Sequence, residues 1–194
     1  MRFKSVSAFV TTAALLPFLA QAEGLSYSYL DAAYINTDID QFDEEVDGFA
    51  LRGSFEITEQ VFLFAGYSNQ STEVLGTDID VEQMNLGVGY AWPIGPKADI
   101  YGKLGYVSAE AEAGGFDVDD DGYLLGVGLR GRPADQLEIE GAVNYTDLSD
   151  SGDTTSVGLA ARWFFTEQFA VGVEGEFGDD ANTYGAGVRW NFGQ

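Results

Sequence analysis

The chain has 194 residues, with 32 Asp and Glu against nine Lys and Arg, and a formal net charge of −23 at pH 7. Such acidity argues against nucleic-acid binding, which depends on Lys and Arg neutralising phosphates. Because the chain has no cysteine and no histidine, it offers no disulfide, no thiolate zinc site and no imidazole base. Aromatic residues make up 14% of the chain and lie in alternating runs, so the acidity does not indicate disorder.

Residues 1–22 have the features of a signal peptide. A positive head contains Arg2 and Lys4, an apolar stretch follows, and an A-x-A cleavage site ends at Ala22. A membrane helix is the alternative, but the apolar stretch is shorter than the roughly 20 residues that span a bilayer. We therefore expect cleavage after Ala22 and one mature domain over residues 23–194.

Beyond this leader, no apolar run approaches the roughly 18 residues of a transmembrane helix. Instead, apolar and polar residues alternate with the period of two that predicts β-strands. The last segment is the clearest, since Tyr184, Val188 and Trp190 share one face while Arg189 lies on the other. In chain order, we predict strands over residues 25–36, 48–57, 60–72, 80–92, 98–111, 122–131, 137–147, 154–165, 168–177 and 184–192.

The third of these segments has an ambiguous register. Phe62 and Phe64 compete with Val61, Leu63 and Tyr67 for the apolar face. If the third or the ninth segment is not a strand, the count falls from ten to eight. An even number is expected in either case for a closed antiparallel barrel.

Connections between the predicted strands alternate between short and long. The short ones lie near residues 58, 94, 134 and 167, and they hold Pro93, Pro96 and Pro133, which cannot donate to a strand ladder. The long ones, at 37–47, 73–79, 112–121, 148–153 and 178–182, are acidic and contain no Lys or Arg. Short periplasmic turns and longer extracellular loops are typical of bacterial outer-membrane barrels.

Aromatic residues gather at both ends of the predicted strands, as the two interfaces of a bilayer require. The predicted belt near the short turns consists of Trp92, Trp163, Trp190 and Phe192. The predicted belt near the long loops consists of Tyr34, Tyr67, Tyr106, Tyr123, Tyr145 and Tyr184. These distributions favour a single closed antiparallel up-and-down transmembrane β-barrel over a soluble β-sandwich, which needs neither belts nor a leader.

The sequence also resembles a known group of proteins. The stretches that carry the resemblance are Leu25-Ser-Tyr-Ser-Tyr-Leu-Asp-Ala-Ala-Tyr34, Phe64-Ala-Gly-Tyr-Ser68, Asp78-Ile-Asp-Val-Glu-Gln83, Gly87-Val-Gly-Tyr90 and Phe116-Asp-Val-Asp-Asp-Asp-Gly-Tyr123. They are similar to the small Gram-negative outer-membrane barrels of the OmpA/OmpX-like kind, and more narrowly to the family once described as a secreted quorum-sensing factor and plant immune elicitor. The resemblance implies an outer-membrane or vesicle protein, without the peptidoglycan-binding domain of full-length OmpA-type proteins.

Charged residues on the inner faces of the predicted strands point to an ion-pair network in the lumen, because charges in a low-dielectric interior persist only when paired or hydrated. The predicted members are Arg52, Glu56, Lys103, Arg130, Glu138, Glu140, Arg162, Glu174, Glu176 and Arg189. The G-x-G-x-x-G stretch at 126–131 lacks the following helix that a dinucleotide site needs, so we expect no cofactor there. Without histidine, we expect no enzymatic activity.

The stretch 117–122 has the D-x-D-x-D-G opening of a calcium loop, with Asp117, Asp119 and Asp121 as candidate ligands. Its twelfth position is Gly128 rather than the bidentate Glu, so only weak Ca²⁺ or Mg²⁺ binding is expected. We predict a surface-interaction barrel whose acidic loops contact cations, lipopolysaccharide or host surfaces, with the barrel-assembly machinery as a folding partner. A small diffusion pore and a vesicle-released signal are the alternatives.

Overall fold

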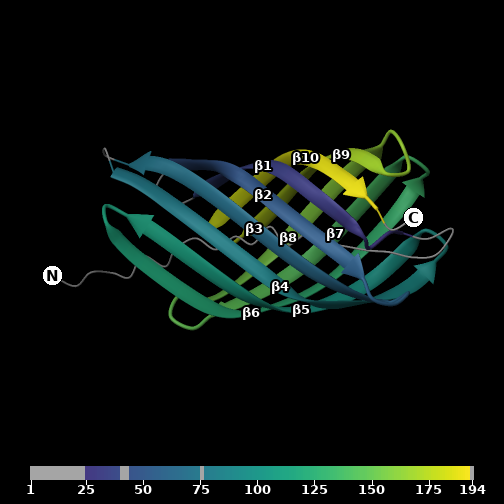
Figure 1. Cartoon of the computed structure of the whole chain (residues 1–194), viewed down its shortest axis with the longest axis horizontal. Helices are drawn as coiled ribbons and strands as arrows, with labels where there is room; N and C mark the ends of the chain where they lie inside the picture. The colour runs from purple at the N-terminus through teal and green to yellow at the C-terminus, as the bar shows by residue number, and fades with distance from the viewer. Residues whose placement is uncertain (1–24, 40–43, 75–76, 193–194) are drawn as a thin grey trace.

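A computed structural model describes residues 25–39, 44–74 and 77–192, and the predicted signal peptide lies outside them. Ten antiparallel strands make up this structure (Figure 1). They are β1 (Tyr29–Ile39), β2 (Glu44–Glu56), β3 (Val61–Val74), β4 (Thr77–Gly95), β5 (Ala98–Ala113), β6 (Phe116–Ala134), β7 (Leu137–Leu148), β8 (Gly152–Phe164), β9 (Phe169–Gly178) and β10 (Ala181–Asn191). In the part of the chain that the structure describes, no helix is long and apolar enough to cross a membrane.

The strands form a closed barrel in which each strand pairs with its neighbours in sequence and β1 pairs with β10. This last pairing runs from Tyr29 opposite Asn191 to Ile39 opposite Ala181, so the final strand joins the first along its whole length. Figure 1 shows the strands tilted around the barrel axis. The predicted ten-stranded, closed antiparallel barrel is therefore confirmed.

Side chains alternate between the outer wall and the lumen, as the period of two requires. In β1, Leu30 points outward with 51% of its surface exposed, while the next residue, Asp31, points inward and is 9% exposed. Outward positions in the middle of the other strands are also apolar, with Leu125, Val143 and Val188 all exposed. The outer wall is thus an apolar surface and the lumen a polar one, which is the pattern of a barrel in lipid.

The structure resolves the register of β3, because Phe62 and Phe64 point into the lumen and are buried. Glycines on the neighbouring strands leave room for their rings. A Cβ atom on Gly89 would lie 2.0 Å from the Phe62 ring, and one on Gly87 would lie 2.6 Å from the Phe64 ring. Each of the two lumen-facing rings therefore lies against a glycine, which has no side chain to clash with it.

The connections between strands are short at one end of the barrel and long at the other, and we call these the short end and the long end. At the short end, tight turns connect β2 to β3, β4 to β5, β6 to β7 and β8 to β9, and β10 ends there (Figure 1). At the long end, the β3–β4 and β5–β6 hairpins project beyond the other strands (Figure 1).

Three predicted loops at the long end, residues 37–47, 73–79 and 112–121, are mostly strand in the structure. Their residues pair across the hairpins, for example Glu110 with Asp119, and the turn between β5 and β6 needs only Gly114 and Gly115 at positive φ. The acidic composition of these segments predicts loops. This prediction is wrong because their residues pair across the hairpins, so the strands are longer than expected.

Candidate functional site

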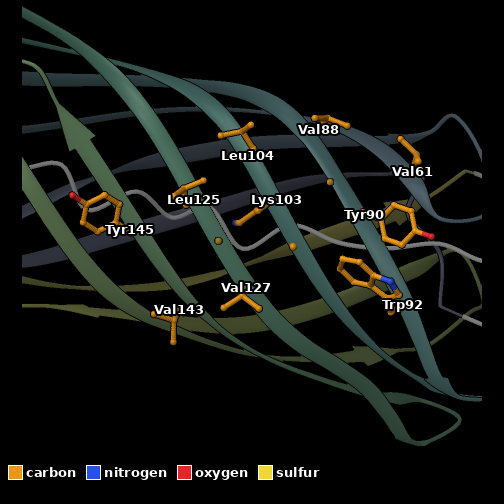
Figure 2. A pocket seen from close by; sticks show the side chains of 13 residues that line it. Val61, Val88, Tyr90, Trp92, Lys103, Leu104, Leu125, Val127, Val143 and Tyr145 are labelled. Carbon is orange, nitrogen blue, oxygen red and sulfur yellow. The ribbon is translucent and has the colours of Figure 1, made fainter.

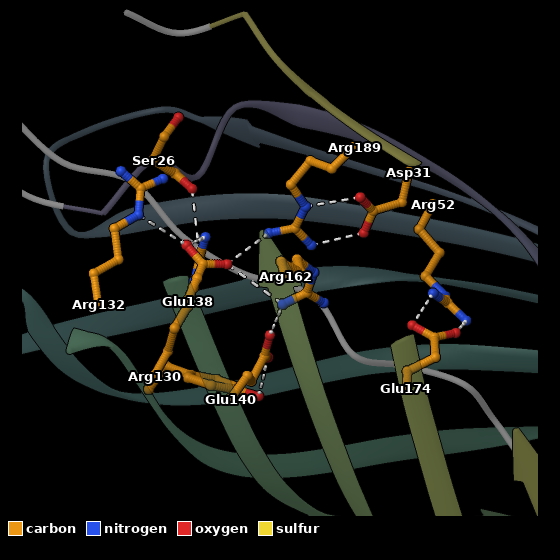
Figure 3. Close-up of polar contacts among 11 residues, drawn as sticks. Ser26, Asp31, Arg52, Arg130, Arg132, Glu138, Glu140, Arg162, Glu174 and Arg189 are labelled. Atoms are coloured by element: carbon orange, nitrogen blue, oxygen red, sulfur yellow. Dashed lines mark hydrogen bonds and ion pairs between the residues drawn. The ribbon is translucent and has the colours of Figure 1, made fainter. Parts of the chain in front are cut away.

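The lumen near the short end contains a cluster of arginines around one carboxylate. Glu138 of β7 is fully buried, and Arg130, Arg132, Arg162 and Arg189 all form ion pairs with it (Figure 3). The Arg132 and Arg189 contacts measure 3.3 Å and 3.4 Å. Strand pairing explains the arrangement, because Arg130 on β6 lies opposite Glu140 and Arg162 on β8 lies opposite Glu138. A single carboxylate thus links strands on several sides of the barrel.

Further ion pairs and hydrogen bonds extend this cluster across the lumen. Glu140 accepts hydrogen bonds from Arg162 at 2.8 Å and from the Tyr101 hydroxyl at 2.9 Å. Arg52 of β2 pairs with Glu174 of β9, which is not a neighbouring strand (Figure 3). Contacts of this kind cross the interior rather than follow the wall, so they fill it with side chains.

The structure places nine of the ten predicted lumen residues inside the barrel as buried or nearly buried side chains, and the tenth, Glu56, is half-buried at the short end. Glu176 accepts a hydrogen bond from the Ser156 hydroxyl, and the Lys103 ammonium lies 5.8 Å from the centre of the Phe64 ring. The prediction missed four inward-pointing charged residues, which are Asp31, Asp99 and Arg132 in the lumen and Asp120 at its mouth. The strand period could have found the first two, since each occupies an inward position of its strand.

Little open volume remains within the ion-pair network. The hollow beside Asp31, Arg52, Arg162 and Arg189 has a volume of about 20 Å³, which is close to the room that one water molecule needs. Segment 25–28 adds to the filling at the short end, where the buried Tyr27 ring stacks on Phe62 at 4.3 Å. Charged and aromatic side chains therefore fill the lumen at the level of the ion-pair network and at the short end.

The predicted aromatic belts lie on the outer wall. Trp92, Trp163, Trp190 and Phe192 are exposed near the short end, and the six belt tyrosines point outward toward the long end. Three of these tyrosines donate hydrogen bonds to outward carboxylates one strand away. The pairs are Tyr34 with Asp47, Tyr67 with Glu82, and Tyr123 with Asp147. Carboxylates therefore border the lipid-facing surface at the long end.

The outer face of the projecting hairpins carries a regular array of acidic residues. Asp80, Glu112 and Asp117 lie opposite one another on β4, β5 and β6, and the next row holds Glu82, Glu110 and Asp119. We call these six residues the acidic grid. Residues directly opposite in antiparallel strands have Cβ atoms about 4.5–5.5 Å apart, where like charges repel. No described Lys or Arg forms an ion pair with any of the six.

The three candidate calcium ligands, Asp117, Asp119 and Asp121, point outward from β6 and are exposed. They do not wrap around one point as the ligands of a calcium loop do, because the stretch is an extended strand. In the regions that the structure describes, no three acidic side chains converge closely enough to hold a metal ion.

Asp120 differs from its neighbours because it points inward and anchors the turn between β7 and β8. Its carboxylate accepts hydrogen bonds from the backbone N–H groups of Asp150 at 3.2 Å and of Ser151 at 2.7 Å. Hydrogen bonds from Ser151, Asp150 and Asp121 hold the pKa of the Asp120 carboxyl below its usual range. This interaction positions one loop at the mouth of the barrel.

An apolar outer wall, two aromatic belts and a lumen of ion pairs define an integral β-barrel membrane protein. The family described as outer membrane protein beta-barrel domain matches residues 6–192. This chain belongs to that family, which places it in the bacterial outer membrane.

Solved structures that are similar to this chain share little sequence with it. The NanC porin has a TM-score of 0.56 and 9% identity over 84% of this chain and all of its own. The KdgM porin has a TM-score of 0.50 and 11% identity, covering 84% and 99%. Ail, the attachment invasion locus protein of Yersinia pestis, has a TM-score of 0.45 and 16% identity, covering 84% and 95%. No curated protein sequence matches.

Proposed function

We propose that this protein is a non-catalytic surface barrel whose acidic grid binds divalent cations and, through them, the phosphates of lipopolysaccharide or other anionic surfaces. The acidic grid is the observation that carries the proposal. Its six carboxylates repel one another across adjacent strands, and a hard divalent cation that prefers oxygen ligands relieves that repulsion. Because such cations can be shared between carboxylates and phosphates, no single closed metal site is required.

The positions of one carboxylate of the acidic grid and of two carboxylates outside it support the same proposal. Asp47, Glu82 and Asp147 are held by belt tyrosines at the upper border of the lipid-facing wall. Belt aromatics mark the membrane interface, so these carboxylates lie at the level of lipid phosphates. Bridging cations at this height would link the barrel to the lipid molecules around it.

Calorimetry with CaCl₂ on the refolded barrel tests cation binding. We expect heat of binding at millimolar calcium, and a clear loss of that heat in the Glu110→Gln/Glu112→Gln variant, which neutralises the centre of the acidic grid. The double variant Glu59→Gln/Glu167→Gln removes the same charge from turns at the short end and serves as the matched control. No binding at millimolar calcium by the unmodified barrel would refute the proposal.

Co-sedimentation of the purified barrel with lipopolysaccharide aggregates tests the second step. Binding that needs calcium, disappears with EDTA and is lost in the Glu110→Gln/Glu112→Gln variant is the expected result. Binding that is equal with calcium and with EDTA would show that cations do not bridge the two. Release in vesicles as a signal stays a prediction from the resemblance, and deletion phenotypes test it.

A further inference from the structure

A groove lies on the outer wall of the barrel, away from the lumen and the acidic grid. Its volume is about 570 Å³, within the roughly 300–1,000 Å³ of small-molecule sites. Outward apolar and aromatic side chains from β3 to β7 surround it (Figure 2). They are Val61, Val88, Tyr90, Trp92, Leu104, Leu125, Val127, Val143 and Tyr145, and the lining also includes three glycines and the buried lumen residue Lys103.

The groove exists because an outward position of β5 is a glycine. Gly102 lies between Tyr90 of β4 and Val127 of β6 in the strand register. A Cβ atom on Gly102 would have no neighbour closer than 3.9 Å. The outward positions of β5 on either side of Gly102 carry large side chains, Ile100 and Leu104. One missing side chain thus leaves a hollow that its apolar neighbours enclose.

The short-end border of the groove has the features of a membrane interface. The Tyr90 and Trp92 rings lie 4.4 Å apart, and the Tyr90 hydroxyl donates a 2.6 Å hydrogen bond to the Gln60 side chain. From Ala98, where β5 begins, to Gly102 is four residues, or roughly 14 Å along the strand. The groove therefore extends from these interfacial aromatic residues into the apolar layer, and its far border is Tyr145 of the long-end belt.

A basic residue lies just beyond this border. Lys97, in the turn between β4 and β5, is the only Lys or Arg of the described residues that lies outside the lumen. Its side chain is half-exposed, and it pairs with Asp135 of the next turn. An anionic headgroup at this level would compete with Asp135 for Lys97.

We propose that the groove holds one acyl chain of a phospholipid from the periplasmic leaflet, with the lipid phosphate near Lys97. Three observations select this occupant. The outer wall of an outer-membrane barrel already faces lipid, the groove is lined almost entirely by apolar surface, and the one accessible cation lies at the headgroup end. The proposal is independent of cation binding by the acidic grid, because the two surfaces lie at opposite ends of the barrel.

Native mass spectrometry of the full barrel, released from bilayer nanodiscs of mixed phospholipids, tests the proposal. The unmodified protein should retain one phospholipid. Gly102→Leu fills the groove, so we expect retention to fall about tenfold, or about 1.4 kcal/mol. Gly102→Val, with a smaller side chain that suits a strand, should lower retention as well and is available if the leucine variant folds poorly.

Gly141→Leu is the matched control. Gly141 is also an outward glycine, but it lies outside the groove and its only close neighbour is the Leu159 side chain at 3.5 Å. This variant should retain lipid as the unmodified protein does, and Lys97→Gln should weaken retention of anionic phospholipids. Equal retention by the Gly102 variants and the unmodified protein would overturn the proposal. The proposal would also be overturned if the unmodified protein formed a dimer without bound lipid and only the Gly102 variants abolished that dimer.

Discussion

Arg189 donates two hydrogen bonds to the carboxylate of Asp31, with Nε–Oδ1 at 2.7 Å and Nη2–Oδ2 at 2.6 Å. The two residues lie directly opposite each other on β10 and β1, the strands whose pairing closes the barrel. The Arg189 guanidinium also lies 3.8 Å from the centre of the Tyr29 ring. A bidentate pair between planar groups fixes both distance and orientation, so it specifies how the last strand aligns with the first.

Replacement of Asp31 by alanine should destabilise the barrel strongly. The change leaves the buried Arg189 charge without its main partner, and breaking a buried pair costs about 3–5 kcal/mol. Urea-induced unfolding in detergent micelles, followed by tryptophan fluorescence, measures the free energy of unfolding. Asp38→Ala removes an exposed carboxylate from the same strand and should change little. Equal effects of the two substitutions would contradict the proposed role of the pair.

The ion pairs that cross the lumen predict that the barrel does not conduct ions. Purified protein in planar bilayers should be silent, because contacts such as Arg52–Glu174 fill the interior. The double variant Arg52→Ala/Glu174→Ala removes two long side chains from the lumen and should produce measurable conductance. Lys97→Ala/Asp135→Ala removes an ion pair from the turns instead and should stay silent. Steady conductance by the unmodified protein would support the pore alternative.

Gly128 should be sensitive even to alanine. It points into the lumen, where a Cβ atom would lie 2.3–2.5 Å from the Tyr101 ring and hydroxyl. Tyr101 is buried and donates to Glu140, so it cannot move without loss, and overpacking of this kind costs about 1–3 kcal/mol. Gly102→Ala, on the open outer wall, is the control in the same urea experiment. A Gly128→Ala barrel as stable as the control would show that the Tyr101 ring can shift freely.

Acid should release the turn between β7 and β8 from β6. The hydrogen bonds to Asp120 favour its ionised form and lower its pKa, so this stabilisation is present above the ordinary Asp pKa of about 3.9. It is lost as the pH falls through the lower pKa of the folded state. NMR hydrogen exchange at the Asp150 and Ser151 amides should show less protection in acid. Asp120→Asn should remove this pH dependence, and its persistence in that variant would exclude Asp120 as the titrating group.

Strand period alone predicted most of the architecture, because one apolar outer face and one polar inner face repeat around the whole barrel. The period did not decide β3, where both faces carry large apolar residues. Which face of β3 points into the lumen depends on glycines of the neighbouring strand β4, since Gly87 and Gly89 leave room for the Phe64 and Phe62 rings. Information of this kind lies on other strands, so local sequence could not supply it.

Sequence patterns identify most of the charged residues of the lumen, but they do not show which of these residues form ion pairs with each other. Arg52 and Glu174 are far apart in sequence and lie on strands that are not neighbours, so no local pattern connects them. Arg132 was missed because the register shifts between Gly131 and Ala134, near Pro133, where simple alternation fails. Composition predicts loops for the acidic hairpins, because it does not show that Glu110 and Asp119 face each other across paired strands.

The full-length pairing of β1 with β10 has a consequence for biosynthesis. Without β10, the free edges of β1 and β9 would have unsatisfied backbone groups, which lipid cannot hydrate. The wall therefore cannot close in the membrane until β10 is in place. A nonsense mutation anywhere before Ala181 should yield no partial product in the membrane, only a chain left for proteases.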